Sequence, residues 1–249
     1  MHFRIVRYDV IDSTSERAFA AIAAGTARHG DVHLARGQTN GRGRFGRTWF
    51  SPTDGGVYAS VVLMPPPPPL SPSVLTMAVG LAVRDAARNV GVSEARLKWP
   101  NDIVVRGAKL AGVLVETRGL DLARPHYVVG IGMNVRAVGF PAALESEREV
   151  TNVEKLGLSA TVDDALEAIL EALDERLAAI TRDPQSIAED YLDASGLADA
   201  VIAVRFGSAE ARGRLLALSL DRGLLLRRDD RTGEEEHVPL ELVREIRML

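Results

Sequence analysis

The chain has 249 residues, of which 46% are hydrophobic and 26% charged, an ordinary composition for a globular protein with a sizeable core. Its net charge of −4 argues against non-specific electrostatic binding of nucleic acid, although it does not exclude a local basic patch. The absence of cysteine excludes disulfides, thiolate metal sites and cysteine nucleophiles. No segment resembles a signal peptide or a membrane span, so we expect a cytoplasmic protein without membrane contact.

The N-terminal part predicts two strands around one helix. Polar and apolar side chains alternate over residues 3–8, which is typical of a strand. Ser13 and Glu16 have the spacing of a capping box, and apolar residues at helical spacing then predict a helix that ends at Gly25. Residues 32–35 predict the second strand.

The middle of the chain predicts long helices and a hairpin. Ser71 followed by proline marks the start of a helix, and the pair Arg106 and Gly107 marks a tight turn between two strands. In chain order we expect a strand at 57–64, an extended surface spacer in the proline run 65–69, a helix from Ser71 to Gly91, strands at 103–105, 110–116 and 127–135, and helices from Thr161 and over 184–194.

The pattern changes after Gly196, where short strands separated by turns replace the helices. We expect strands at 201–206, 211–218, 224–227 and 237–240. A run of short strands of this kind predicts a small β-barrel or sandwich appended to an α+β domain.

A loop rich in glycine and arginine occupies residues 41–47. It matches the dinucleotide fingerprint G-x-G-x-x-G formally, but aromatic residues, a proline and a strand follow it where that fingerprint requires a helix. Glycine allows a ligand to approach the backbone, and arginine matches carboxylate and phosphate groups. The residues alone leave two interpretations open, a solvated basic loop or a site that holds an anion.

Two further segments combine polar groups with close backbone approach. Lys98 and Trp99 precede a proline turn that carries Asn101 and Asp102, and Lys109 starts an otherwise apolar strand. A lysine at a strand start is usually a solvated edge charge, yet beside such a turn it can also bind an anion. The glycines of residues 130–135 suggest close approach of a ligand or another backbone.

With these motifs in this order, the chain resembles biotin protein ligases. The resemblance covers essentially the whole chain and rests on Asp12-Ser13-Thr14, on Gln38 with residues 41–52, on Lys98-Trp99-Pro100-Asn101-Asp102, on Lys109-Leu110-Ala111-Gly112, and on Gly130-Ile131-Gly132-Met133-Asn134-Val135. Two positions depart from the family's usual pattern, namely Ser15, where asparagine is common, and Asn40, where a small residue is common. Neither departure removes a charged catalytic group.

The resemblance implies a fold and a reaction. The expected fold is α+β, with a mixed β-sheet packed by helices in a class II synthetase-like catalytic domain at residues 1–196 and an SH3-like β-barrel at 197–249. Biotin and ATP would form biotinyl-5′-AMP and pyrophosphate, and a lysine of a biotin carboxyl carrier domain would then take the biotin and release AMP. Larger relatives carry an N-terminal winged helix that binds DNA, and a ligase-like strand that begins at residue 3 implies no such domain and no nucleic-acid partner.

The resemblance also implies roles for individual residues. Lys109 and Arg44 would be catalytic, bridging the biotin carboxylate and the α-phosphate. The biotin site would comprise Ser13, Thr14, Ser15, Gln38, Gly41, Arg42, Gly43, Arg44, Lys109 and Gly112, with Gly112 leaving room for the ring system. The ATP and adenylate site would comprise Arg44, Arg47, Trp49, Asn101, Lys109 and Asn134. Mg²⁺ would enter with ATP and contact Asn101 and Asp102, unless Asp102 instead orients Arg44.

Several alternatives stay open at this point. A lipoate or octanoate ligase or transferase shares the general fold, and a biotin-binding regulator without catalysis would keep the same pocket. A nucleic-acid-binding protein could use the arginine loop. The oligomeric state, monomer or homodimer, is not determined by the sequence. We also expect the arginine loop and residues 137–150 to be mobile until ligands bind.

Overall fold

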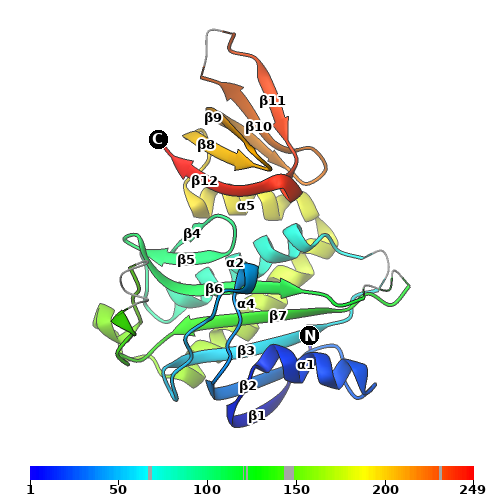
Figure 1. Cartoon of the computed structure of the whole chain (residues 1–249), viewed down its shortest axis with the longest axis vertical. Helices are drawn as coiled ribbons and strands as arrows, with labels where there is room; N and C mark the ends of the chain where they lie inside the picture. The colour runs from blue at the N-terminus through cyan, green and yellow to red at the C-terminus, as the bar shows by residue number, and fades with distance from the viewer. Residues whose placement is uncertain (67–68, 120, 122, 143–148, 230–231) are drawn as a thin grey trace.

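A seven-stranded mixed sheet forms the larger part of the molecule (Figure 1). The structure is a computed structural model, and it describes residues 1–66, 69–119, 121, 123–142, 149–229 and 232–249. The sheet has the order β1-β2-β3-β7-β6-β5-β4. Its strands are β1 (Arg4–Ile11), β2 (Asp31–Gln38), β3 (Gly56–Leu63), β4 (Arg96–Lys98), β5 (Asp102–Val105), β6 (Ala108–Glu116) and β7 (Tyr127–Asn134).

The helices divide between the two faces of this sheet (Figure 1). Helix α1 (Thr14–Ala23) connects the parallel strands β1 and β2, and all other neighbouring strands are antiparallel. Helices α2 (Pro72–Asn89) and α4 (Val162–Arg182) pack together against one face, whereas α1 packs with Val62 and Val128 on the other. This confirms the expected α+β fold with a mixed sheet.

Strand alternation decides which residues each face presents. On β7, Val129, Ile131 and Met133 enter the core beneath α2 and α4. Successive side chains point to opposite faces, so Gly130 and Gly132 face the α1 side. The glycines suspected from the sequence therefore lie on the one face that large helices leave uncovered.

Helix termini show one prediction confirmed and one wrong. Helix α5 (Pro184–Ser195) confirms the helix expected over 184–194, and Gly196 after it adopts the left-handed conformation with a φ of 70°. The capping box expected at Ser13 and Glu16 does not form, because the Ser13 side chain makes no capping hydrogen bond. Glu16 binds the guanidinium groups of Arg42 and Arg118 instead.

The C-terminal strands form a five-stranded antiparallel sheet of order β11-β10-β9-β8-β12. This confirms an appended β-sheet, but among the described residues no pairing of β11 with β12 closes it into a barrel. Its strands are β8 (Val201–Phe206), β9 (Ala209–Ser219), β10 (Gly223–Arg228), β11 (Glu235–Val238) and β12 (Val243–Met248). Three short 3-10 turns complete the described elements, η1 (Arg44–Gly46), η2 (Glu154–Leu156) and η3 (Leu240–Leu242).

Sequence patterns missed β4 and β12, which lie near one another where the two sheets meet across α5 (Figure 1). One hydrophobic cluster runs through both parts, from Val32 to Ile246, so the division at residues 196 and 197 stays a prediction. The expectations for the proline run 65–69 and for residues 137–150 fall partly on residues 67–68 and 143–148, which lie outside the described residues.

The buried carboxylate of Asp31 fastens β2 to the edge strand β1. It accepts hydrogen bonds from Nε and Nη2 of Arg4 at 2.7 and 2.6 Å and from the backbone N–H of Arg28 at 2.8 Å. The Arg4 hydrogen bond is the main cause that lowers the pKa of Asp31. The charged form is therefore the one that the folded state stabilises.

We expect Asp31→Asn to lower the free energy of unfolding by about 2 kcal/mol near pH 7, because charge-assisted hydrogen bonds to a buried group are lost. A depressed folded-state pKa contributes stability above the unfolded value of roughly 3.9, and this contribution is lost as the pH falls. Urea unfolding at several pH values should show the two proteins converging below about pH 4. An equal difference at pH 3 and pH 7 would contradict this linkage.

Candidate functional site

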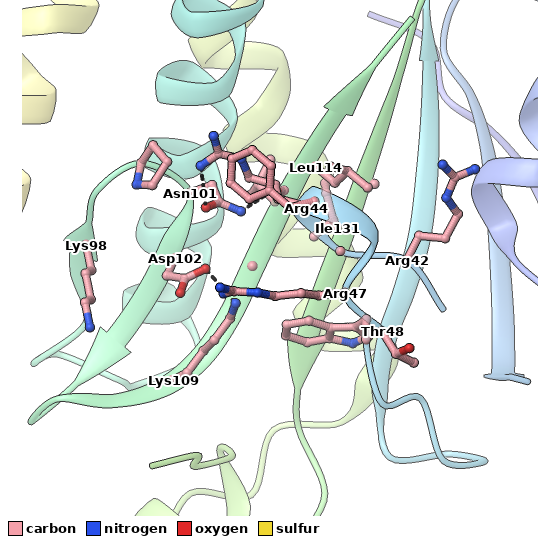
Figure 2. A pocket seen from close by; sticks show the side chains of 18 of the residues that line it. Arg42, Arg44, Arg47, Thr48, Lys98, Asn101, Asp102, Lys109, Leu114 and Ile131 are labelled. Carbon is pink, nitrogen blue, oxygen red and sulfur yellow. Dashed lines mark hydrogen bonds and ion pairs between the residues drawn. The ribbon is translucent and has the colours of Figure 1, made fainter. Parts of the chain in front are cut away.

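A cavity of about 690 Å³ opens on the α1 side of the sheet, which we call the reaction cavity. Segments far apart in the sequence line it, from the arginine loop to the C-terminal sheet. Figure 2 shows the part of the cavity where the arginine loop faces Asn101, Asp102 and Lys109. Most of the residues singled out from the sequence line it, namely Thr14, Ser15, Gln38, Arg42, Gly43, Arg44, Arg47, Trp49, Asn101, Asp102, Lys109 and Gly112. Ser13, Gly41 and Asn134 do not line it.

One end of the reaction cavity carries uncharged hydrogen-bonding groups. Oε1 of Gln38 accepts from the backbone N–H of Thr14 at 2.8 Å and from its hydroxyl at 3.1 Å. The hydroxyl of Ser60 lies 2.8 Å from that of Thr14 and 3.1 Å from that of Ser15. Nearby in the chain, the hydroxyl of Ser13 is buried and has no hydrogen-bond partner among the described residues. This end can therefore recognise a neutral polar group.

The backbone of the arginine loop is closed by its own hydrogen bonds. The N–H of Trp49 donates to the carbonyl of Gly41 at 2.9 Å, and the N–H of Gly43 donates to that of Arg47 at 2.8 Å. A Cβ at Gly41 would collide with the Trp49 carbonyl oxygen, so glycine is needed there for close approach. Phe45 at the tip has a φ of 57° and is 67% exposed, an uncommon conformation for a bulky side chain.

Arg42 and Arg44 of the loop point to different partners, while Arg47 extends toward Asp102 and Lys109 (Figure 2). Arg42 binds Glu16 and, at 2.8 Å, Glu116. Nη1 of Arg44 donates to Oδ1 of Asn101 at 3.4 Å (Figure 2). Burial lowers the pKa of Arg44, while Asp102 acts in the opposite direction, and the guanidinium stays charged near neutral pH. The loop thus places one half-buried cation beside the turn at Asn101.

A second cation, Lys109, is held beside the first. Its Nζ lies 2.6 Å from Oδ1 of Asp102 and 5.1 Å from the centre of the Trp49 ring. Both partners of the ion pair are largely shielded, with the side chains of Lys109 and Asp102 13% and 26% exposed. Asp102 therefore orients Lys109, whereas Arg44 is hydrogen-bonded by Asn101. The amide of Asn101 is itself fixed, because its Nδ2 donates to the carbonyl of Val113 at 2.6 Å.

Trp49 lies flat on a glycine platform. Gly112 and Gly132 are direct partners across β6 and β7, and a Cβ at Gly132 would overlap the indole. A Cβ at Gly112 would lie 3.1 Å from both Lys109 and Trp49, so without ligand Gly112 accommodates these side chains. Its predicted role, room for a bound ring system, is untested. Asn134 lines a separate small cavity with Trp49 and Lys109.

We expect Gly132→Ala to displace Trp49 and to destabilise the fold by about 1–3 kcal/mol, the usual cost of overpacking. The chain has two tryptophans, so fluorescence of the variant in a Trp99→Phe background reports Trp49. Gly80→Ala on α2 is the matched control, because its Cβ would meet Leu97 at 3.4 Å, an ordinary contact. Unchanged Trp49 emission and unchanged stability in Gly132→Ala would contradict the packing of the Trp49 indole against Gly132.

Sequence reasoning missed several residues that line the reaction cavity. Ser60 is one, since a serine within an apolar strand gives little signal. Five more come from the C-terminal sheet, namely Arg205, Arg244, Glu245, Ile246 and Arg247. Cζ of Arg244 lies 5.9 Å from the centre of the Phe45 ring, so the C-terminal sheet reaches the arginine loop. Recognition of β12 as a strand would have raised these residues as candidates.

The cavity offers few groups for a metal ion. Within the described residues, no group of three or more His, Cys, Asp and Glu side chains is placed to hold one. Of the two predicted ligands, Asp102 uses Oδ1 for Lys109 and Asn101 uses Oδ1 for Arg44. One carboxylate and one amide suit a Mg²⁺ ion that is coordinated mainly by phosphate oxygens and water.

In the described part of the chain, no helix combines the length and the apolar character needed to cross a membrane.

Comparison with protein families and curated proteins gives consistent matches. Residues 8–134 match the biotin/lipoate A/B protein ligase family. The bifunctional ligase/repressor BirA of Escherichia coli is 31% identical over 172 residues, which cover 67% of this chain and 53% of that protein. A biotin–[acetyl-CoA-carboxylase] ligase of Mycobacterium tuberculosis is 34% identical over 184 residues, 72% of this chain and 66% of that one. The chain thus spans about half the length of the BirA-type relatives it matches.

Solved structures show the same fold over nearly the whole chain. A biotin protein ligase from Aquifex aeolicus, solved with biotin and ATP, has a TM-score of 0.81 and 24% identity and covers 99% of both chains. A biotin protein ligase from Leishmania major, solved with biotinyl-5-AMP, has a TM-score of 0.64 and 27% identity, covering 94% of this chain and 98% of that one. The C-terminal sheet is therefore part of the shared architecture.

Proposed function

Because the chain belongs to the biotin/lipoate A/B protein ligase family, we propose that it is an ATP-dependent biotin protein ligase. It activates biotin with ATP to biotinyl-5′-AMP, releasing pyrophosphate. It then transfers the biotinyl group to a lysine of a biotin carboxyl carrier domain and releases AMP. Relatives named biotin–[acetyl-CoA-carboxylase] ligase support this proposal.

One observation carries the proposal, which is the polarity of the reaction cavity from end to end. Thr14, Ser15 and Gln38 make one end neutral and rich in hydrogen-bonding groups. Lys109 and Arg44 make the other end cationic. Biotin has the same polarity, with a neutral ureido group at one end and a carboxylate at the other, and the cationic end is where that carboxylate meets ATP.

The same observation favours biotin over lipoate or octanoate. The head of those acids is a dithiolane ring or a methyl end, neither of which can satisfy buried hydroxyl and amide groups. A polar site that hydrogen-bonds its ligand rejects an analogue without the matching groups by orders of magnitude. Either acid would place an apolar head against the hydroxyl and amide groups of Thr14, Ser15, Gln38 and Ser60 and could add no hydrogen bond to them.

For the first step, the chain supplies charge compensation. The biotin carboxylate and the α-phosphate are both anionic, and Lys109 and Arg44 lower the cost of bringing them together. Asp102 positions Lys109 through their ion pair. Arg47, exposed at the mouth of the cavity, serves the outer phosphates, and Trp49 and Asn134 serve the adenine side. The oxygen of biotin's carboxylate forms the bond to phosphorus as pyrophosphate leaves.

For the second step, the site protects a reactive mixed anhydride. The acceptor lysine, as the neutral amine, attacks the biotinyl carbonyl, and AMP leaves as the amide forms.

Mg²⁺, entering with ATP, would supply further charge neutralisation at the phosphates. Asn101 and Asp102 would hold it, Asp102 through its second carboxylate oxygen, because Oδ1 contacts Lys109. Arg42 and Gly43 shape the biotin side, where Glu16 and Glu116 hold Arg42 in place.

The test is a mass measurement on an acceptor. The protein is incubated with biotin, ATP, Mg²⁺ and a biotin carboxyl carrier domain, and the expected result is the mass increase of one biotinyl group. Modification with lipoate in place of biotin would overturn the proposal in favour of a lipoate ligase. Biotin binding without pyrophosphate release would show that the protein is a non-catalytic regulator.

Three expectations stay predictions. They are the cytoplasmic location, the absence of nucleic-acid and membrane partners, and the oligomeric state, monomer or homodimer.

A further inference from the structure

A second hollow of about 900 Å³ lies where the two sheets meet, and we call it the basic groove. The end of α2, the edge strand β4, the end of α5 and β12 line it. Six of its lining residues are basic and two are acidic, the basic ones being Arg84, Arg88, Arg96, Lys98, Arg106 and Arg247 and the acidic ones Glu94 and Asp193. Since the whole chain carries a net charge of −4, this is a local concentration of positive charge.

Three of these cations are available to a partner. Arg88, Arg96 and Lys98 are exposed and form no ion pair with residues in the part of the chain that the structure describes. Strand alternation explains two of them, because the buried Leu97 enters the core while Arg96 and Lys98 point outward from β4. Arg88 joins them from the last turn of α2. Glu94, whose pKa is lowered mainly by its hydrogen bond with Arg106 and also by the charge of Arg96, compensates only part of this positive charge.

The basic groove is continuous with the reaction cavity. Lys98, Trp99, Ile246 and Arg247 line both. Figure 2 shows Lys98 set apart from the Arg44 and Lys109 cluster, beyond Asp102. A macromolecule seated in the groove would therefore lie beside the place where the adenylate forms.

The lining of the groove favours a protein over nucleic acid. Ala194, Leu197 and Ile246 form an almost fully buried floor, and the apolar side chain that a partner can reach is Met248, which is 63% exposed at the edge of the groove. Nucleic-acid sites are dominated by contacts to phosphate, whereas a protein interface combines an apolar centre with a charged rim. A basic rim around apolar side chains is complementary to an acidic protein face with some exposed apolar residues.

We propose that the basic groove docks an acidic face of the acceptor carrier domain and so guides its lysine into the reaction cavity. This inference rests on the proposed function, because only a transfer reaction needs such a partner. Arg88 and Arg96 would act on encounter and affinity, at a distance from the reacting atoms. Charges at the rim of an interface change the association rate and its salt dependence more than the chemistry.

The test reverses these two charges in Arg88→Glu/Arg96→Glu, with Arg88→Ala/Arg96→Ala as a milder pair if the first folds poorly. Biotin-dependent pyrophosphate exchange needs no carrier, and it should stay within about twofold of wild type. The half-saturating carrier concentration in the transfer step should rise about tenfold with little change in maximal rate, and its dependence on salt should weaken. Transfer to hydroxylamine, a small nucleophile that needs no docking, should be unchanged.

Arg182→Glu/Arg222→Glu is the matched control, because both residues are exposed and line neither cavity. An unchanged half-saturating carrier concentration in the groove variant would overturn the docking proposal while leaving the proposed function intact. Absence of pyrophosphate exchange in the wild type would instead refute the proposed function itself. A salt-sensitive gel shift of DNA by wild type that the groove variant loses, with carrier use unchanged, would assign the groove to nucleic acid.

Discussion

Replacing Lys109 by alanine should lower the rate of biotin-dependent pyrophosphate exchange about 1,000-fold while the protein stays folded. The side chain of Lys109 is only 13% exposed at the centre of the reaction cavity, and its Nζ forms an ion pair of 2.6 Å with Asp102. A charge held rigidly in a shielded site stabilises developing negative charge far more than a solvated one. The exchange assay measures this step alone, because it needs no acceptor.

Two companion variants separate charge from packing. Lys109→Met keeps an unbranched stem beside Gly112 and Trp49 but removes the charge, so it should be as inactive as alanine. Lys155→Ala removes an exposed lysine on η2 that does not line the reaction cavity and should leave the rate unchanged. If Lys109→Met kept near-wild-type exchange with folding intact, the catalytic assignment of Lys109 would be wrong.

Arg44→Ala should lower the same exchange rate about 100-fold. Arg44 is half-buried and aimed at the turn of Asn101 by a hydrogen bond of 3.4 Å, so its guanidinium faces the region between biotin and phosphate. Arginine can hold two oxygens at once in a planar fork. Arg44→Lys should recover only part of the loss, because an ammonium lacks that geometry.

The control for Arg44 is an arginine that does not line the reaction cavity. Arg222→Ala alters the exposed turn between β9 and β10 and should exchange pyrophosphate at the wild-type rate. Circular dichroism and urea unfolding should show all these variants folded. Wild-type exchange in Arg44→Ala would remove this residue from the catalytic assignment and leave Lys109 as the central cation.

The fold could be read from the sequence where local signals were strong. The turn at Arg106 and Gly107 is an example, since both residues adopt positive φ, of 50° and 88°, as a tight hairpin of this kind requires. Strand β4 was missed because it has only three residues, and β12 because three of its six residues are charged. Pairing with neighbouring strands makes both of them strands. The expected capping box failed for a related reason, since Arg42 and Arg118 from distant segments take the carboxylate of Glu16.

The candidate site could be read in part from the motifs. Residue types and order indicated an anion site at Arg44 and Lys109, and the cavity contains both. The pairing could not be foreseen, because Asp102 was assigned to metal or to Arg44 and instead contacts Lys109. Nor could the sequence show that Gly112 lies against Trp49 and Lys109, which depends on the register of β6 with β7.

The sequence by itself determined the chemistry available to this protein. It placed glycines where close approach is needed and arginine, lysine and tryptophan in the segments that meet at the site. Only the tertiary structure decided which partners these groups have. It pairs Lys109 with Asp102 in an ion pair, packs the Trp49 indole against Gly112 and Gly132, and places the Arg244 guanidinium over the Phe45 ring. Local propensity acts within a few residues, whereas these contacts come from the register of strands and from two sheets meeting at β4 and β12.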